Sequence, residues 1–310
     1  MCFKLYPDCK VVIGKTRSAI YDLTRNGIFI IPRDLSECID NDNVIHYNNL
    51  SADKQKEFID FLLENELGRF NMPKEIVPLS NEFISPSKIS NAILDIGNND
   101  LPLHKIALEL SELVCESVFL RFVNKSSLDY IITCSKNFIS QSMSSLEIGI
   151  RYEGGIEEHI YSLIQQIQIC TRIIVVNSPF IKTEIIGAGI PIRYVRKGFT
   201  CNNNLNSDFS SFSNANLPLY LESLKYNNCL NGKLAIDQYG NIKNCPELAK
   251  IFGNINNDVS LSDIVESSEF QRLWKINKDC FEKCQDCELR YACQHCIILK
   301  QDCSYNVYKD

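Results

Sequence analysis

Cysteine is the residue that most constrains this chain of 310 amino acids, because fifteen are present and they are unevenly placed. Seven are scattered before residue 202. A scattered cysteine usually acts as a small buried apolar side chain. Eight lie from Cys229 onward, and six of those fall between Cys280 and Cys303. A group of thiols this dense indicates either disulfides or a metal site, and the cellular compartment decides between them.

The N-terminal sequence predicts a cytoplasmic protein. MCFKLYPDCK lacks the basic segment, apolar core and small-residue cleavage site of a signal peptide. No apolar run approaches the roughly 20 residues that span a bilayer, so we expect no membrane partner. In a reducing cytoplasm thiols rarely form disulfides, and metal or iron–sulfur ligation is therefore the favoured role of the clustered cysteines.

The charge balance argues against a nucleic-acid partner. Lys and Arg number 32 against 38 Asp and Glu, which gives a net charge of −6. Affinity for nucleic acid depends largely on basic side chains that neutralise phosphates. The apolar fraction of 45% is that of a folded globular protein, so a largely disordered chain is also excluded.

The spacing of the clustered cysteines favours an iron–sulfur cluster over zinc. Two x2 pairs are separated by only five residues, whereas zinc ribbons usually place about 15–20 residues between such pairs. Three thiols at x2 and x5 spacing with a distant fourth suit a 4Fe–4S cluster, and structural zinc stays the alternative. The candidate metal ligands are Cys229, Cys245, Cys280, Cys284, Cys287, Cys293, Cys296 and Cys303.

Sequence patterns divide the chain into three domains. Residues 1–78 predict a small α+β module, with strands near 10–13, 18–23 and 27–31 and a helix from the N-cap Ser51 to Gly68. Residues 79–215 alternate strands and helices, which predicts repeated βαβ units and a parallel sheet, open or curved into a partial barrel. Strands are expected at 92–96, 117–123, 146–152, 172–178 and 190–196, and a short helical piece before the last.

The third domain, residues 216–310, is rich in cysteine. IDQYGNIKNCP at 236–246 predicts a hairpin around Tyr239-Gly240-Asn241, which would return the chain so that Cys245 approaches Cys229. A turn and an amphipathic helix are expected within 252–274.

The spacing of the clustered cysteines resembles that of a known family. C-x10-G-x4-C from Cys229, followed by C-x2-C-x5-C from Cys284, resembles the SPASM domain of radical S-adenosylmethionine peptide-modifying enzymes. CQDCELRYACQHC with the late CSYNVY resembles, more specifically, the SPASM-domain peptide maturases of grasp-with-spasm systems, which are encoded beside ATP-grasp ligases. The resemblance implies a partial (β/α) barrel of radical SAM type, auxiliary 4Fe–4S clusters, a precursor-peptide substrate and an ATP-grasp ligase as partner.

The same resemblance implies two sets of cluster ligands. One cluster would be held by Cys284, Cys287, Cys293 and Cys303. Cys229, Cys245 and Cys296 would hold the other, whose fourth position is open. The candidates for that position are Cys280, Asp237 and His295, or a ligand-accessible site.

The catalytic motif of radical SAM enzymes is missing. Such enzymes carry C-x3-C-x2-C after the first barrel strand, but AILDI at 92–96 is followed by GNNDLPLHK. The literal match at Cys280, Cys284 and Cys287 lies near the end of the chain with no barrel after it. We therefore expect no S-adenosylmethionine chemistry and a degenerate barrel.

The N-terminal module resembles, more weakly, the winged-helix elements that bind the leader peptide of ribosomal-peptide precursors. Gly27–Ile31 would be the docking edge and Phe58–Leu67 the helical wall, or the module is a structural cap. The favoured function is a 4Fe–4S SPASM protein that binds a ribosomally made precursor or presents it to an ATP-grasp ligase. The alternatives are a redox or Lewis-acid peptide-modifying enzyme with an open auxiliary cluster, and a zinc-stapled structural module.

Overall fold

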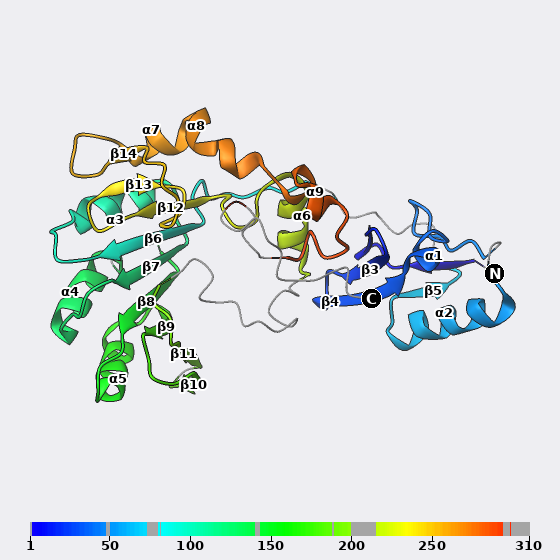
Figure 1. The fold of residues 1–310 in the computed structure, drawn as a ribbon, viewed down its shortest axis with the longest axis horizontal. Helices are drawn as coiled ribbons and strands as arrows, with labels where there is room; N and C mark the ends of the chain where they lie inside the picture. Colours follow the sequence, from blue (N-terminus) through cyan, green and yellow to red (C-terminus); the bar gives the residue numbers. More distant parts are fainter. Residues whose placement is uncertain are drawn as a thin grey trace. The chain divides into compact units, whose positions relative to one another are not determined.

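The structure is a computed structural model that describes residues 2–47, 50–72, 80, 82–139, 143–187, 189–199, 215–293 and 298. Its chain forms two compact units, each drawn from separate stretches of sequence (Figure 1). Unit 1 comprises Met1–Ile84, Leu205–Asn228 and Ile276–Asp310, and unit 2 comprises Ser85–Asn204 and Cys229–Lys275. The three continuous domains expected from the sequence stay a prediction.

A nine-stranded sheet organises unit 2. The five neighbouring pairs from β11 to β12 are parallel, and the pairs at the two edges are antiparallel. The five strands predicted for this region are confirmed, so unit 2 is a mixed α/β fold with a large, mostly parallel sheet. Curvature into a partial barrel stays a prediction. In spatial order the strands are β10 (Lys182–Ile186), β11 (Ile190–Tyr194), β9 (Cys170–Val176), β8 (Ser145–Arg151), β7 (Ser117–Phe122), β6 (Asn91–Ile96), β12 (Lys233–Ile236), β13 (Asn241–Lys243) and β14 (Gly253–Asn254).

Strand β10 corrects one expectation. The short helical piece predicted before residue 190 is wrong, because Lys182–Ile186 pairs antiparallel with β11. The turn between them contains Gly187 and Gly189, whose φ angles are 57° and 94°. These left-handed conformations cost glycine little, so the chain reverses tightly and the preceding segment becomes an edge strand.

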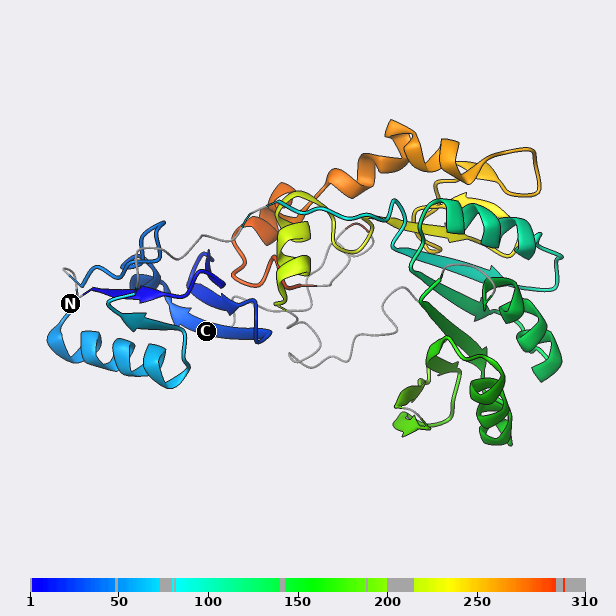
Figure 2. The same ribbon diagram turned by 180° about the vertical axis from the view of Figure 1, so that it is seen from behind.

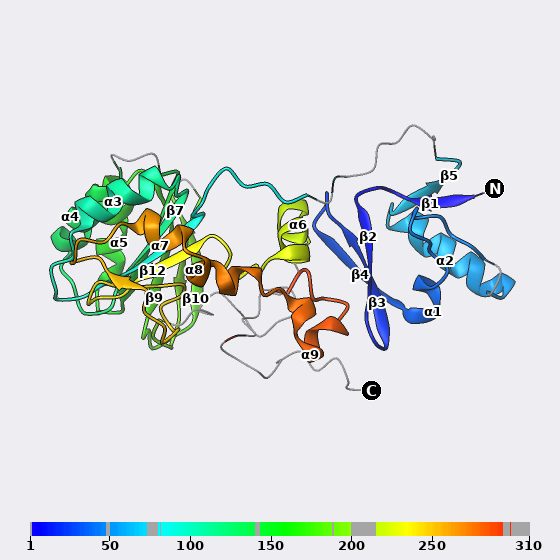
Figure 3. The ribbon, with the colours of Figure 1, turned by 90° about the horizontal axis from the view of Figure 1, so that it is seen from above.

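Three helices cover one face of this sheet: α3 (Leu103–Glu112), α4 (Leu128–Ile139) and α5 (Ile156–Gln166) (Figure 3). Each has a buried apolar side, for example Leu110, Phe138 and Leu163, which are fully buried. None of the helices in the described part of the chain has the length and apolar character needed to cross a membrane.

The central strands also carry paired charges that are buried or half-buried. Asp95 of β6 accepts two hydrogen bonds from Arg121 of β7, at 2.6 Å to Oδ1 and 2.9 Å to Oδ2. The Arg121 side chain is only 6% exposed, and its guanidinium lies 5.4 Å from the centroid of the Phe199 ring. Glu147 of β8 forms an ion pair with Arg172 of β9. Paired charges therefore cross the middle of the sheet at neighbouring strands.

The amphipathic helix expected within 252–274 is divided into short pieces: α7 (Leu261–Glu266), α8 (Ser268–Gln271) and the 3-10 turn η2 (Arg272–Lys275). Ser267 interrupts it, because its backbone is extended and its hydroxyl accepts the Phe270 N–H at 3.2 Å. A serine in this conformation ends one helix and caps the next.

Unit 1 contains two small antiparallel sheets. β2 (Cys9–Ile13), β3 (Arg17–Asp22) and β4 (Gly27–Pro32) form one in that order, and β1 (Phe3–Leu5) pairs with β5 (Gly68–Phe70). The helices are α1 (Arg33–Ser36), α2 (Ala52–Glu64) and α6 (Leu217–Lys225), with the 3-10 turn η3 (Lys278–Cys280) and α9 (Glu282–Gln285) near the cysteines. Figure 2 shows α2 beside the strands. Three predicted strands and the cap Ser51, whose hydroxyl accepts the Lys54 N–H, are confirmed, and winged-helix topology stays a prediction.

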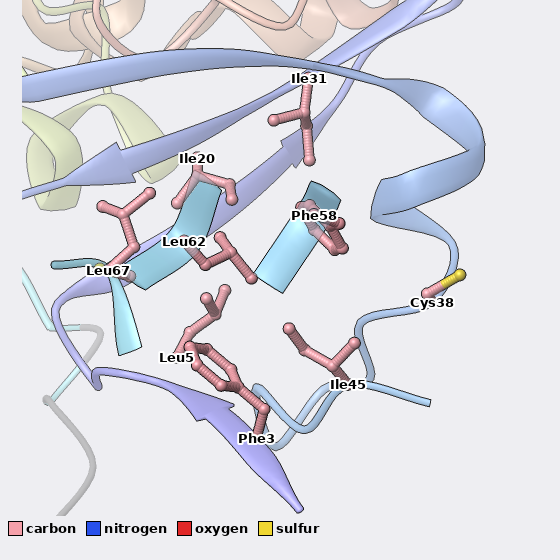
Figure 4. Packing of buried hydrophobic residues seen from close by; sticks show 10 residues of the cluster. Phe3, Leu5, Ile20, Ile31, Cys38, Ile45, Phe58, Leu62 and Leu67 are labelled. Atoms are coloured by element: carbon pink, nitrogen blue, oxygen red, sulfur yellow. The ribbon is translucent and has the colours of Figure 1, made fainter. Parts of the chain in front are cut away.

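Strand β3 is buried on both of its faces. Ile20 belongs to a core with α2, β1 and β5, whereas Ala19 and Tyr21 belong to a second core with Tyr220 and Ala292. Successive side chains of a strand point to opposite faces, so β3 separates the two cores. Figure 4 shows the first core, whose buried members are Phe3, Leu5, Cys9, Ile20, Ile31, Cys38, Ile45, Phe58, Leu62 and Leu67.

We expect Leu62→Ala to destabilise unit 1 by about 3 kcal/mol, because a fully buried leucine leaves a cavity when it is shortened. Leu63→Ala is the matched control, since Leu63 is the next residue of α2 and is 44% exposed. Hydrogen exchange of the α2 amides measures the difference. Equal protection in the two variants would contradict the packing in Figure 4.

Candidate metal centre

The structure describes six of the eight predicted metal ligands. Cys280, Cys284, Cys287 and Cys293 belong to unit 1, and Cys229 and Cys245 to unit 2. Cys296 and Cys303, together with His295, lie outside the described residues. Within the part of the chain that is described, no three His, Cys, Asp or Glu side chains form a group that would hold a metal ion. The two ligand sets implied by the resemblance therefore stay predictions.

The segment from Cys284 to Cys293 winds through consecutive tight turns. Cys284 lies in α9, and its carbonyl accepts the Cys287 N–H at 2.9 Å. The Leu289 N–H lies 3.4 Å from the Cys287 Sγ and donates to it. Both thiols are 8% exposed. An x2 pair on a tight turn, with a backbone N–H directed at one sulfur, is the local arrangement of a cysteine that holds metal as a thiolate.

Cys293 is held through its backbone. Its N–H donates to the Leu289 carbonyl at 2.9 Å. Its own carbonyl accepts hydrogen bonds from Asn228, at 3.0 Å, and from the Lys278 ammonium. The residue therefore has a fixed backbone position in unit 1, while its side chain is half-buried.

The turn around Cys287 is attached to the N-terminal sheet. The Lys15 N–H donates to the Asp286 carbonyl at 2.8 Å, and the Tyr21 hydroxyl donates to the Glu288 carbonyl at 2.8 Å. Arg17 contacts Glu288 Oε1 through Nε at 3.0 Å and Nη2 at 2.7 Å. The residues on both sides of Cys287 are therefore bonded to β3 or to the hairpin before it.

Glu288 attaches the turn to β3 through an ion pair between its buried carboxylate and Arg17. Its side chain is fully buried, and Oε2 has no hydrogen-bond partner among the described residues. A buried carboxylate needs a compensating charge, which Arg17 supplies. Burial and the charge of Cys287 raise the pKa of Tyr21 well above its usual value, so its hydroxyl stays protonated as a donor. Gly14 allows the close approach, since a Cβ there would lie 2.9 Å from the Glu288 nitrogen.

Sequence analysis missed Gly14, Arg17, Tyr21 and Glu288. One local signal was present: Ser18–Tyr21 is a run of small and apolar residues without the alternation of a half-exposed strand. Such a run indicates a strand buried on both faces. It does not indicate which segment covers the second face.

The hairpin predicted around Gly240 is confirmed by β12 and β13. Asp237 builds its turn: Oδ1 accepts the N–H groups of Tyr239 and Asn241, each at 3.0 Å. Burial raises the pKa of Asp237, but its hydrogen bonds with Asn241 and Tyr239 outweigh burial and leave the pKa below its usual value. Cys245, just after β13, is fully buried. Asp237, one of the candidates for the open cluster position, is thus engaged in the turn.

The surroundings of the sulfur atom differ between the scattered cysteines and the turn at Cys284–Cys287. The structure describes twelve of the fifteen cysteines. Burial raises the pKa of Cys9 and Cys115 to about 12 and that of Cys170 to about 11, which keeps them protonated. Five of the seven scattered cysteines are buried as predicted, Cys2 is exposed, and Cys201 lies outside the described residues. The turn at Cys284–Cys287, with an N–H donated to sulfur, fits a thiolate-bound metal.

Amide side chains occupy the loop after β6, where a radical SAM motif would lie. The Asn99 amide donates to the Gln238 carbonyl at 3.1 Å, and Asn98 bonds to Asn124 at 3.0 Å. A Cβ on Gly97 would come within 2.4 Å of Gln238 Oε1. This loop is therefore closely packed against the β12–β13 turn, and its sequence contains no cysteine.

One family model matches the chain, over residues 228–288. The matched family is SPASM. It is described as an iron-sulfur cluster-binding domain. The SPASM match includes Cys229, Cys245, Cys280, Cys284 and Cys287, and it ends at Glu288, the residue anchored by Arg17.

The search of solved structures found a likeness to the crystal structure of Streptococcus suis SuiB bound to precursor peptide SuiA. The alignment covers 96% of each chain with 10% sequence identity and a TM-score of 0.30. A TM-score this low supports no conclusion about this chain. Comparison with curated proteins gave no match.

Proposed function

We propose that this protein is an iron–sulfur SPASM protein that takes part in the maturation of a ribosomally made peptide. The SPASM match over residues 228–288 carries the proposal, because it covers five of the clustered cysteines. We assign it a binding role: it holds the precursor peptide and presents it to an ATP-grasp ligase. The missing C-x3-C-x2-C motif after β6 supports binding rather than radical catalysis.

The metal centre would contain one or two 4Fe–4S clusters. Cys284, Cys287 and Cys293 would hold one together with Cys303. Cys229, Cys245 and Cys296 would hold the other, with Cys280 or His295 as a fourth ligand, since Asp237 is committed to its turn. A 4Fe–4S cluster supplies redox or Lewis-acid chemistry and also cross-links the segments that ligate it.

The edge of β4 is the proposed docking site for the precursor. In the described three-stranded sheet, β4 pairs only with β3, so its other edge has unpaired backbone groups. A pocket of about 410 Å³ lies beside it, lined by Ile30 and Ile31 of β4 and by Phe58 and Phe61 of α2. An extended peptide can add to such an edge as a strand and place alternate side chains in the pocket.

Iron, acid-labile sulfide and zinc per chain, measured on anaerobically purified protein, test the metal assignment. About four or eight irons with matching sulfide are expected. Zinc without sulfide would contradict the proposal and leave a structural module. Co-purification with the neighbouring precursor and ligase tests the binding role, and binding to neither would overturn it. A mass change in the precursor without the ligase would instead indicate a peptide-modifying enzyme.

Phe61→Asp is expected to weaken precursor binding at least about tenfold, because a buried aromatic contact is replaced by a charge. Phe61 lines the pocket, whereas Leu63, two residues further along α2, is exposed and does not. Leu63→Asp is therefore the matched control. Calorimetric titration of both variants with the precursor measures the effect, and equal weakening would argue against the β4 edge.

A further inference from the structure

The turn that contains Cys287 is held by a second segment far away in sequence. Asp286 and Glu288, on either side of Cys287, are bonded through their carbonyls to Lys15 and Tyr21. The Glu288 carboxylate is bonded to Arg17. These contacts fix the backbone before and after the sulfur-bearing residue.

We propose that Arg17 and Tyr21 are positioning residues for the metal cluster that Cys287 binds. The inference rests on the proposed iron–sulfur function and extends the site to strand β3, outside the SPASM match. Neither residue supplies a ligand. They act through Glu288, which Arg17 neutralises and Tyr21 holds by its carbonyl.

Two physical effects connect these residues to the cluster. The Cys287 Sγ accepts the Leu289 N–H, so the direction of the sulfur follows the backbone of residues 287–289. Glu288 follows Cys287 in the chain and its carboxylate is buried, so without Arg17 its negative charge would be uncompensated within unit 1. Added negative charge lowers the reduction potential of an iron–sulfur cluster, and loss of supporting contacts weakens metal retention.

The experiment uses the full chain, purified and reconstituted anaerobically, as wild type, Arg17→Met, Arg17→Lys and Tyr21→Phe. The readouts are the rate of iron release to a chelator, the midpoint potential and the electron paramagnetic resonance spectrum of the reduced protein. Arg25→Met is the matched control. Arg25 is 44% exposed against 40% for Arg17, and it also pairs with a buried carboxylate of the same sheet, that of Asp22.

Arg17→Met is expected to release iron about 10–100 times faster and to shift the midpoint potential to lower values. Arg17→Lys should bring the iron-release rate and the midpoint potential most of the way back to the wild-type values, because lysine keeps the positive charge. Tyr21→Phe keeps the buried ring and removes one hydrogen bond, so it tests the positioning role even where Arg17→Met does not fold. Arg25→Met should leave release rate, potential and spectrum unchanged.

Different results would overturn the proposed function and the positioning role. A wild-type chain without iron and sulfide would overturn the proposed function. A wild-type chain with clusters, whose release rate and potential stay the same in Arg17→Met and Tyr21→Phe, would overturn only the positioning role. The same holds where Arg25→Met changes the cluster as much as Arg17→Met does, since that result would reflect general destabilisation of unit 1.

Discussion

Replacing Cys287 with alanine should lower the iron content of the anaerobically purified chain by about four ions, the content of one 4Fe–4S cluster. Alanine removes the sulfur that accepts the Leu289 N–H, and an alanine side chain cannot ligate metal. The loss of acid-labile sulfide should match the loss of iron. Iron, sulfide and visible absorbance per chain measure the change.

Cys134→Ala is the control for this experiment. Cys134 is a buried cysteine of α4, 4% exposed against 8% for Cys287, and burial raises the pKa of its thiol. Its removal should leave iron and sulfide unchanged. Equal iron in wild type and Cys287→Ala would contradict the assignment of Cys287 as a ligand. Loss of zinc without loss of sulfide would favour the structural-zinc alternative.

Arg121→Met should destabilise unit 2 by about 3–5 kcal/mol. The substitution keeps an unbranched apolar stem but leaves Asp95, whose side chain is 13% exposed, without its charge partner in the sheet. The chain has a single tryptophan, Trp274, which is buried in unit 2. Urea unfolding followed by its fluorescence therefore reports on the unit that contains Arg121.

Two further variants separate this ion pair from ordinary surface charge. Lys125→Met breaks the contact of Lys125 with Glu153, which is longer at 3.6 Å and lies at the surface, so a change of about 1 kcal/mol or less is expected. The double variant Asp95→Leu with Arg121→Met should recover most of the stability, because no lone charge stays buried. A double variant as unstable as Arg121→Met would show that packing, rather than the unpaired carboxylate, sets the cost.

Local sequence patterns predicted most of the sheet in unit 2. Its inner strands are β-branched segments separated by helices of regular length, and both features are visible within a short window. Strand β10 was missed because Lys182–Ile186 is an exposed edge strand, whose identity depends on its partner β11. The helix expected within 252–274 was predicted as one element because an interruption at Ser267 leaves the apolar spacing around it nearly unchanged.

The candidate site was predictable where its residues are close in sequence. The turn from Cys284 to Cys287 and the hairpin before Cys245 follow from short spacings. The attachment of Glu288 to Arg17 could not be predicted from spacing, since 271 positions separate the two residues. A single sequence contains no signal that pairs residues so far apart. Only the run of small and apolar residues at Ser18–Tyr21 indicated that both faces of β3 are covered.

The position of β3 between two cores has a consequence for the order of folding. One of those cores includes Ala292, so the N-terminal sheet stays incomplete while the ribosome is still synthesising the middle of the chain. Val12, Ala19 and Tyr21 expose apolar surface until the segment around residues 286–292 emerges. Closure of unit 1 therefore waits until residues 286–292 have been synthesised, and chaperones that shield apolar strands would act on β2 and β3 before then.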